Sequence, residues 1–178
     1  MGKAKTQIVL DTNVIIHFIK GGCIGILHKI YSSYDLVILG SVMEEELPPH
    51  MSHRKVLDKC MALIKGGIRV VDWTPSEEYE IADFAELEKK FGTGESLCLV
   101  YCKYNHNVIA SSNVRHIYSF CEKNDIQYVT TTDLLYHAYQ IGKMTIEQCD
   151  EFILAVNNNG SNLGINKMSD YKPRTIHV

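Results

Sequence analysis

Three acidic residues, Asp11, Glu46 and Glu95, stand where a parallel sheet could bring their carboxylates together. Asp11 directly follows the apolar run 7–10, whereas Glu46 and Glu95 lie on predicted helices that follow an apolar run and a glycine turn. Ligands of parallel α/β sheets gather at the carboxyl ends of the strands. Converging carboxylates repel one another unless a cation lies between them, and Mg²⁺ or Mn²⁺ prefers such oxygen ligands. The set therefore predicts a divalent-metal site that could activate water for attack on a phosphodiester.

Polar residues at two later strand ends are expected to complete this site. Asn113 and Ser112 follow the apolar run 108–110 and could offer neutral oxygens, while Asp133 follows the run 125–129 and could add a carboxylate. Ordinary structural roles stay open for all of them, since Asp, Ser and Asn commonly cap helix N-termini. The same holds for Asp11 as a strand-end cap and for Glu95, because negative charge is favourable near a helix N-terminus.

Glu44 and Glu45 compete with Glu46 for the metal role because they share one helical segment. Ser41 stands three residues before Glu44, which is the spacing of a capping box. The sequence therefore predicts a helix that begins at Ser41 and breaks at the prolines 48–49.

His50-x-x-His53 also has metal-ligand spacing, but no further Cys or His stands at a compatible distance, so an exposed loop is the better interpretation. Basic residues could border the acidic site and meet phosphates, although most such residues are simply solvated. They are Arg115, His116, Lys103 and Lys123.

The elements that must position these residues alternate between strand and helix. Apolar runs predict strands at 7–10, 36–39, 68–71, 108–110 and 125–129. Predicted helices cover 14–19, 24–31, 56–65, 95–103, 114–123, 132–141 and 145–156, and another starts near Glu77. Such alternation indicates a parallel sheet covered by helices on both faces. We therefore expect a three-layer α/β/α fold, with one domain over 1–156 and a polar C-terminal tail, 157–178, that is loosely docked or flexible.

Composition narrows the class of protein. The chain of 178 residues has 46% hydrophobic residues and a formal net charge of -3, so bulk electrostatic attraction to nucleic acid is not expected. The six cysteines form no C-x-x-C pair and are expected to be reduced core thiols. The start of the chain holds no apolar stretch long enough for a signal peptide or a membrane span, which predicts a cytoplasmic protein without a membrane partner.

The opening segment I-V-L-D-T-N-V-I, residues 8–15, resembles the first strand and D-T-N signature of the PIN-domain nuclease family. Further pieces follow in the family's order: Glu46-Leu47, Gly94-Glu95-Ser96-Leu97-Cys98, the segment 129–135, and Gly142-Lys143-Met144-Thr145. The similarity spans about residues 7 to 153. It implies a PIN-like fold and a metal-dependent endoribonuclease, either a toxin of a toxin-antitoxin pair or an RNA-processing enzyme. It also implies metal ligation by Asp11, Glu46 and Glu95, orientation of the site by Asn13, and RNA, an antitoxin or a second copy of the chain as partners.

One departure from the family weakens this reading. Where PIN nucleases usually carry Asp, this chain has Ser111-Ser112-Asn113, and each lost carboxylate removes a charge that helps to hold the metal. The alternative is a catalytically inactive PIN-like domain that binds RNA or a protein. A phosphatase would need a second Asp at position 13, where Asn13 stands, and no nucleotide-binding glycine motif follows a strand.

Overall fold

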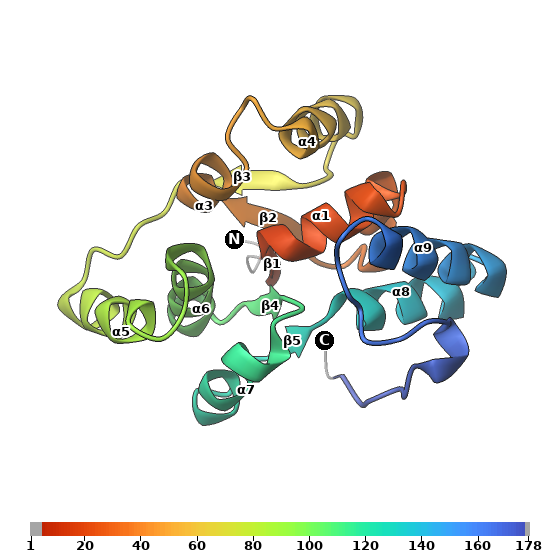
Figure 1. Ribbon diagram of the computed structural model, residues 1–178. Coiled ribbons are helices and arrows are strands. Elements are labelled where there is room, and N and C mark those ends of the chain that lie inside the picture. Colours follow the sequence, from red (N-terminus) through yellow and green to blue (C-terminus); the bar gives the residue numbers. More distant parts are fainter. Residues whose placement is uncertain (1–4, 177–178) are drawn as a thin grey trace.

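Short apolar runs form the strands of a five-stranded sheet in the computed structural model, which describes residues 5–176. The strands are β1 (Gln7–Leu10), β2 (Asp35–Leu39), β3 (Arg69–Val71), β4 (Val108–Ala110) and β5 (Tyr128–Val129). All pairings are parallel and the spatial order is β3-β2-β1-β4-β5 (Figure 1). Parallel strands are usually buried on both faces, which explains why β1, β2 and β4 are mainly apolar rather than alternating.

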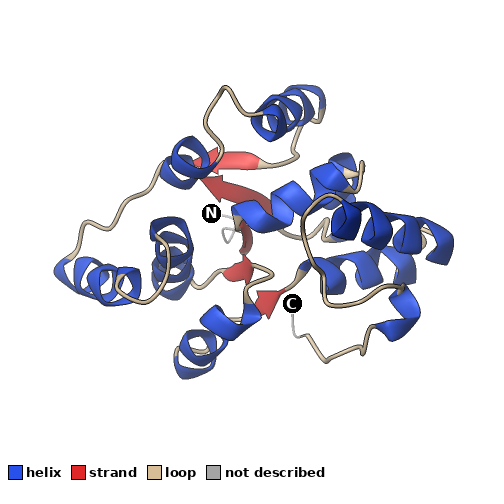
Figure 2. Ribbon diagram, in the orientation of Figure 1, coloured by secondary structure: helices blue, strands red, loops and turns tan. Residues whose placement is uncertain are grey.

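Helices cover both faces of the sheet, as Figure 2 shows. They are α1 (Thr12–Lys20), α2 (Leu27–Ile30), α3 (Gly40–Glu46), α4 (Ser52–Leu63), α5 (Glu78–Glu88), α6 (Thr93–Asn105), α7 (Val114–Lys123), α8 (Thr131–Gln140) and α9 (Ile146–Asn158), with 3-10 turns η1 (Ile24–Ile26) and η2 (Met168–Asp170). Successive strand residues face opposite layers. Ile8 and Leu10 belong to the core that includes residues of α1, α8 and α9, whereas Val9 belongs to the core that includes residues of α6 and α7. The predicted three-layer α/β/α class is confirmed.

The strand order reverses beside β1. The chain runs outward from β1 to β2 and β3, then crosses back to place β4 on the other side of β1. In open α/β sheets the crevice at the carboxyl ends of such strands is where ligands bind. Asp11 and Ser111 directly follow β1 and β4, and the backbone N–H of Asp11 donates to the carbonyl of Ala110 at 2.9 Å. Two polar residues therefore lie side by side at this switch point.

The start of α3 differs from the sequence prediction. The helix begins at Gly40 with Leu39 as its N-cap, so Ser41 lies inside the helix and its buried hydroxyl has no hydrogen-bond partner among the described residues. Glu44 forms no cap and instead accepts a 2.7 Å hydrogen bond from Arg54 of α4. The predicted capping box is wrong because β2 runs straight into the helix and a buried guanidinium provides Glu44 with a stronger, charge-assisted partner.

The C-terminal segment packs against the domain. α9 continues to Asn158, two residues past the expected domain boundary, and Met168 of η2 is buried in the same core as α9. Arg174 pairs with Asp133 and lies over the ring of Tyr128, 4.1 Å from its centroid. Residues 159–176 are thus docked along α8 and β5, while the first four residues of the expected domain and the last two of the expected tail lie outside the described residues. Within the described residues, no helix combines the length and apolar character that crossing a bilayer requires.

Candidate functional site

Asp11 occupies the centre of the site because β1 ends beside β4. It is the N-cap residue of α1 and is only 4% exposed. Its Oδ2 accepts hydrogen bonds from the hydroxyl of Ser111 at 2.7 Å and from the amide of Asn13 at 2.6 Å. Two donors on one oxygen fix the orientation of the carboxyl group, and neither of them meets Oδ1. Asn13 therefore helps to orient the carboxyl group of Asp11.

Glu46 reaches the same place from the last residue of α3. Its Oε2 accepts a hydrogen bond from the hydroxyl of Thr12, the residue after Asp11. Its carboxyl also lies against the backbone of α6 at Gly94, where a Cβ atom would overlap Oε1 and come within 2.7 Å of Cδ. Glu46 can therefore keep this position only while residue 94 has no Cβ atom.

Arg54 helps to position Glu46 by donating hydrogen bonds to the backbone at the C-terminal end of α3. Its guanidinium is buried and donates to the carbonyl of Leu47 at 2.9 Å, and it also pairs with Glu44 and Asp58. Orphan carbonyls at a helix C-terminus are favourable partners for a cation. Arg54 thus ties α4 to the turn that follows Glu46. Glu44 and Glu45 are exposed, so of the three consecutive acids only Glu46 reaches the site.

Glu95 lies in the first turn of α6 and is 7% exposed. Its Oε2 lies 3.2 Å from Nδ1 of His116 on α7, whereas its buried Oε1 has no hydrogen-bond partner among the described residues. The imidazole of His116 stacks on Phe91, with ring centroids 5.5 Å apart. An unsatisfied buried carboxylate oxygen is costly, so a positive ligand at Oε1 would remove a real penalty.

Asp11, Glu46 and Glu95, which we call the acidic cluster, are electrostatically coupled. The pKa of Asp11 is raised from 3.8 to about 6, mainly by burial and then by the charges of Glu46 and Glu95, against the opposing hydrogen bond from Ser111. Burial also raises the pKa of Glu95, with His116 and, more weakly, Asn113 acting in the opposite direction. The carboxylates therefore resist being charged together, which is the condition that a bound cation relieves.

The segment after β4 joins the acidic cluster to a second polar chain. The backbone N–H of Ser112 donates to Oδ1 of Asn13 at 3.1 Å, and its hydroxyl lies 2.7 Å from that of Thr131. Thr131 in turn contacts Nδ1 of the buried His17 at 2.9 Å. Burial lowers the pKa of His17 from 6.5 to about 4, so the imidazole is neutral near pH 7. Thus the hydroxyl of Ser111 donates to Asp11, whereas the hydroxyl of Ser112 hydrogen-bonds with Thr131.

Asn113 and Asp133, the other predicted members, have different placements. Asn113 is the exposed N-cap residue of α7, and its side chain is near enough to Glu95 to lower the pKa of that group. Asp133 is held in a separate arrangement by the backbone of Thr130, the hydroxyl of Tyr171 and the guanidinium of Arg174. Although burial acts to raise it, these partners hold the pKa of Asp133 below its ordinary value. Asp133 anchors the C-terminal segment and is not joined to the acidic cluster.

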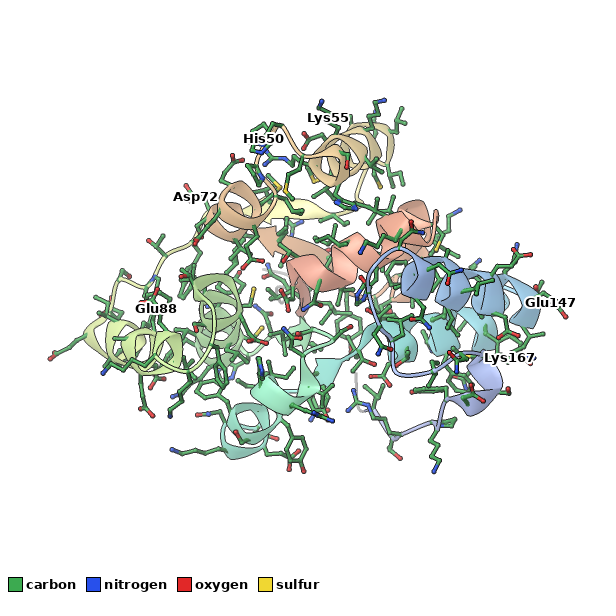
Figure 3. The ribbon with its side chains drawn as sticks, viewed as in Figure 1. His50, Lys55, Asp72, Glu88, Glu147 and Lys167 are labelled. Atoms are coloured by element: carbon green, nitrogen blue, oxygen red, sulfur yellow. The ribbon has the colours of Figure 1, made fainter. Side chains whose placement is uncertain are left out.

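The remaining candidates lie mostly outside the site. His50 is exposed in the turn before α4 (Figure 3), and His53 follows in the first turn of that helix. Lys103 pairs with Asp83 of α5. Together with Lys123, it lines a groove between α5, α6 and α7. Among the predicted basic residues, His116 is the one that contacts the acidic cluster.

Within residues 5–176, no three His, Cys, Asp or Glu side chains form a ready-made group for holding a metal ion. A scan against protein-family models and searches of curated proteins and of solved structures found no match for this chain. Function is therefore inferred from the geometry of the acidic cluster. Mg²⁺ commonly uses only one or two protein carboxylates and completes its shell with waters and substrate phosphates. The orphan Oε1 of Glu95 and the oriented carboxyl of Asp11 fit that pattern.

Four polar residues around the site were not singled out from the sequence: Thr12, His17, Arg54 and Thr131. His17 follows Asn13 by four residues, so a helix places both on one face, and this spacing could have indicated a shared polar network. Thr12 was visible only as part of the D-T-N signature. Thr131 gave no signal of this kind because its partner Ser112 is 19 residues away. Arg54 gave none because its bonds to Glu44 and Leu47 depend on how the loop between α3 and α4 folds.

Proposed function

We propose that this chain is a metal-dependent endoribonuclease of PIN type, in which the acidic cluster holds Mg²⁺ or Mn²⁺. The observation that carries the proposal is the buried Oε1 of Glu95, which has no partner among the described residues. It belongs to a cluster in which burial, together with the charges of Glu46 and Glu95, raises the pKa of Asp11 to about 6. Buried acids of this kind are costly to the fold, and perturbed acids in a crevice are typical of functional sites. The position at the switch point of the sheet supports the same conclusion.

The chain's own residues would prepare the site for phosphodiester hydrolysis. Ser111 and Asn13 hold the carboxyl of Asp11, Thr12 holds Glu46, and His116 holds Glu95, so each acid has a positioning partner. Mg²⁺ or Mn²⁺ bound there would supply water activation and stabilise the negative charge that develops on the phosphate. Three helices, α1, α6 and α7, begin at the cluster. Their N-terminal dipoles favour the approach of an anionic phosphate.

The test is calorimetric titration of Mn²⁺ together with cleavage of RNA by the same samples. Wild type should bind Mn²⁺ and cleave RNA, and Asp11→Asn should do neither. Glu46→Gln should weaken both activities, whereas Glu45→Gln, an exposed neighbour on α3, is the matched control and should behave as wild type. Absence of Mn²⁺ binding and of cleavage in the wild type would refute the proposal.

A second function, an inactive PIN-like domain that binds RNA or a protein, is favoured by one observation. Ser111 already satisfies an oxygen of Asp11 where the family usually places another acid, so the site is partly stabilised without metal. RNA binding without Mn²⁺ binding or cleavage would support this function.

A further inference from the structure

A groove opens beside the acidic cluster, between α5, α6 and α7, which lie next to one another in Figure 1. Its volume of about 270 Å³ is just below the range of roughly 300–1,000 Å³ that is usual for ligand sites, so it suits a small group of the size of one nucleotide. Its lining contains three lysines, two phenylalanines and two acids: Lys90, Lys103, Lys123, Phe91, Phe120, Asp83 and Glu86. The mechanism above uses none of these residues.

Phe91 connects this groove to the acidic cluster. It lines the groove and stacks on His116, whose Nδ1 lies 3.2 Å from Oε2 of Glu95. The two rings are nearly parallel, at 18°, and the side chain of His116 is 56% exposed. The stacked rings of Phe91 and His116 therefore connect Glu95 of the acidic cluster to the groove. Planar rings exposed in this way are the surfaces on which unpaired bases stack.

The charges of the groove favour a polyanion although the whole chain is acidic. Lys103 is neutralised by Asp83, but the pair between Lys90 and Glu86 is exposed on both sides and holds Lys90 weakly. Lys123 is exposed and forms no salt bridge with any residue in the described range. Two ammonium groups are thus available for phosphates, one from the end of α5 and one from the end of α7.

We propose that this groove binds single-stranded RNA that leads into the acidic cluster, with a base stacked on His116 and phosphates at Lys90 and Lys123. This inference rests on the proposed ribonuclease function and names how its substrate is held. An unpaired strand is the expected form because the rings can stack only with a base that is free of its own helix. Stacking tolerates every base, so the groove gives affinity with little sequence preference.

The experiment measures fluorescence anisotropy of a labelled single-stranded RNA of roughly 12 nucleotides, within the usual range of single-strand site sizes. EDTA is present throughout, so binding is observed without metal or cleavage. Lys123→Ala and Lys90→Ala should each weaken RNA binding by about five-fold. Each should also reduce the slope of log K against log salt concentration by about 0.7. Lys55→Ala on α4, far from the groove in Figure 3, is the matched control and should bind as wild type.

A second pair of variants tests the stacked ring. His116→Ala should weaken binding about ten-fold, whereas His116→Phe, which keeps a planar ring without the imidazole, should restore most of it. If wild type binds the RNA but neither the lysine nor the His116 variants differ from Lys55→Ala, the groove is not the binding site. Failure of wild type to bind any single-stranded RNA would also overturn the inference and leave the groove to a protein segment.

The same samples separate the two proposals. Cleavage in Mn²⁺ that is unaffected by Lys90→Ala and Lys123→Ala would support the nuclease function without this groove. RNA binding that depends on Lys123 and His116, in a protein that neither binds Mn²⁺ nor cleaves, would keep the groove and refute the nuclease.

Discussion

Replacing Asp11 with Asn should change how the stability of the metal-free protein depends on pH. Burial, with the charges of Glu46 and Glu95, raises the pKa of Asp11 from 3.8 to about 6 in the folded protein. Because the folded protein binds this proton more tightly than the unfolded chain does, protonation of Asp11 stabilises the folded state at low pH. That contribution is complete below about pH 4 and is lost as the pH rises through about 6. Since one pKa unit corresponds to 1.36 kcal/mol, the charged carboxyl costs the fold about 3 kcal/mol near neutrality.

Replacing Asp11 with Asn removes the cost of the buried charge but disrupts some hydrogen bonds to this side chain. If its NH₂ group replaces Oδ2, it meets the donors Ser111 and Asn13, which costs about 1–3 kcal/mol at every pH. The difference in unfolding free energy between Asp11→Asn and wild type should therefore move by about 3 kcal/mol in favour of the variant from about pH 4 to about pH 7. Urea denaturation in EDTA at several pH values measures it, with Glu45→Gln as the control for loss of an exposed charge.

Bound Mn²⁺ should make the wild type more stable than Asp11→Asn. At Mn²⁺ concentrations about a hundred times the Kd, wild type should gain about 2.7 kcal/mol and Asp11→Asn almost nothing. A stability difference between variant and wild type that stays constant over the whole pH range would refute the reasoning, because it would show that burial and like charge do not strain Asp11.

Three other predictions follow from particular contacts. Gly94→Ala should leave the unfolding free energy within about 1 kcal/mol of wild type, because Ala favours helix, the carboxyl of Glu46 is flexible and Val42 Cγ1, at 3.2 Å, needs to shift only slightly. It should nevertheless reduce Mn²⁺ affinity about 10- to 100-fold in calorimetry. Arg174→Ala should destabilise the protein by about 2–4 kcal/mol in urea denaturation, since it leaves the buried carboxylate of Asp133 unpaired, and Asp133→Asn in the same background should recover part of that loss. Calorimetric titration of Mn²⁺ near pH 6 in buffers of different ionisation enthalpy should show release of a fraction of a proton from Asp11, and an enthalpy independent of the buffer would contradict its raised pKa.

Most of the sheet was predictable because β1, β2 and β4 are buried on both faces and are short, mainly apolar runs, although β3 is an exposed edge strand. β1 and β4 have the predicted limits, and β2 and β3 differ by one residue at their starts. β5 is shorter than the run 125–129, because Asp125 adopts a left-handed conformation with φ 54° and Ile126 donates to the carbonyl of Cys121. Those residues end α7 by satisfying its last carbonyls, a demand that an apolar pattern does not reveal.

The candidate site was predictable where position along a strand determines it and not where long-range contacts do. Asp11 follows directly from the end of β1. The choice of Glu46 over Glu44 depends on Arg54, whose hydrogen bonds to Glu44 and Leu47 could not be read from the local sequence. Asp133 also follows a strand, but it lies at the third position of α8 rather than at the N-cap, and Arg174, 41 residues later, binds it. Position near a strand end thus predicts which acids can enter a site, and arginines from other elements bind the acids that do not.

The polar network at the switch point explains why the acidic cluster should respond to a cation. Asp11 connects through Asn13 to Ser112, and Ser112 connects through Thr131 to His17. His17 has a lowered pKa of about 4, so its stabilising neutral form is present above about pH 6.5 and is lost as the pH falls through 4. It cannot supply positive charge in the range where Asp11 ionises. Among the described residues, no lysine or arginine pairs with the carboxyl groups of the acidic cluster, and a divalent cation is the ligand that would balance their charge.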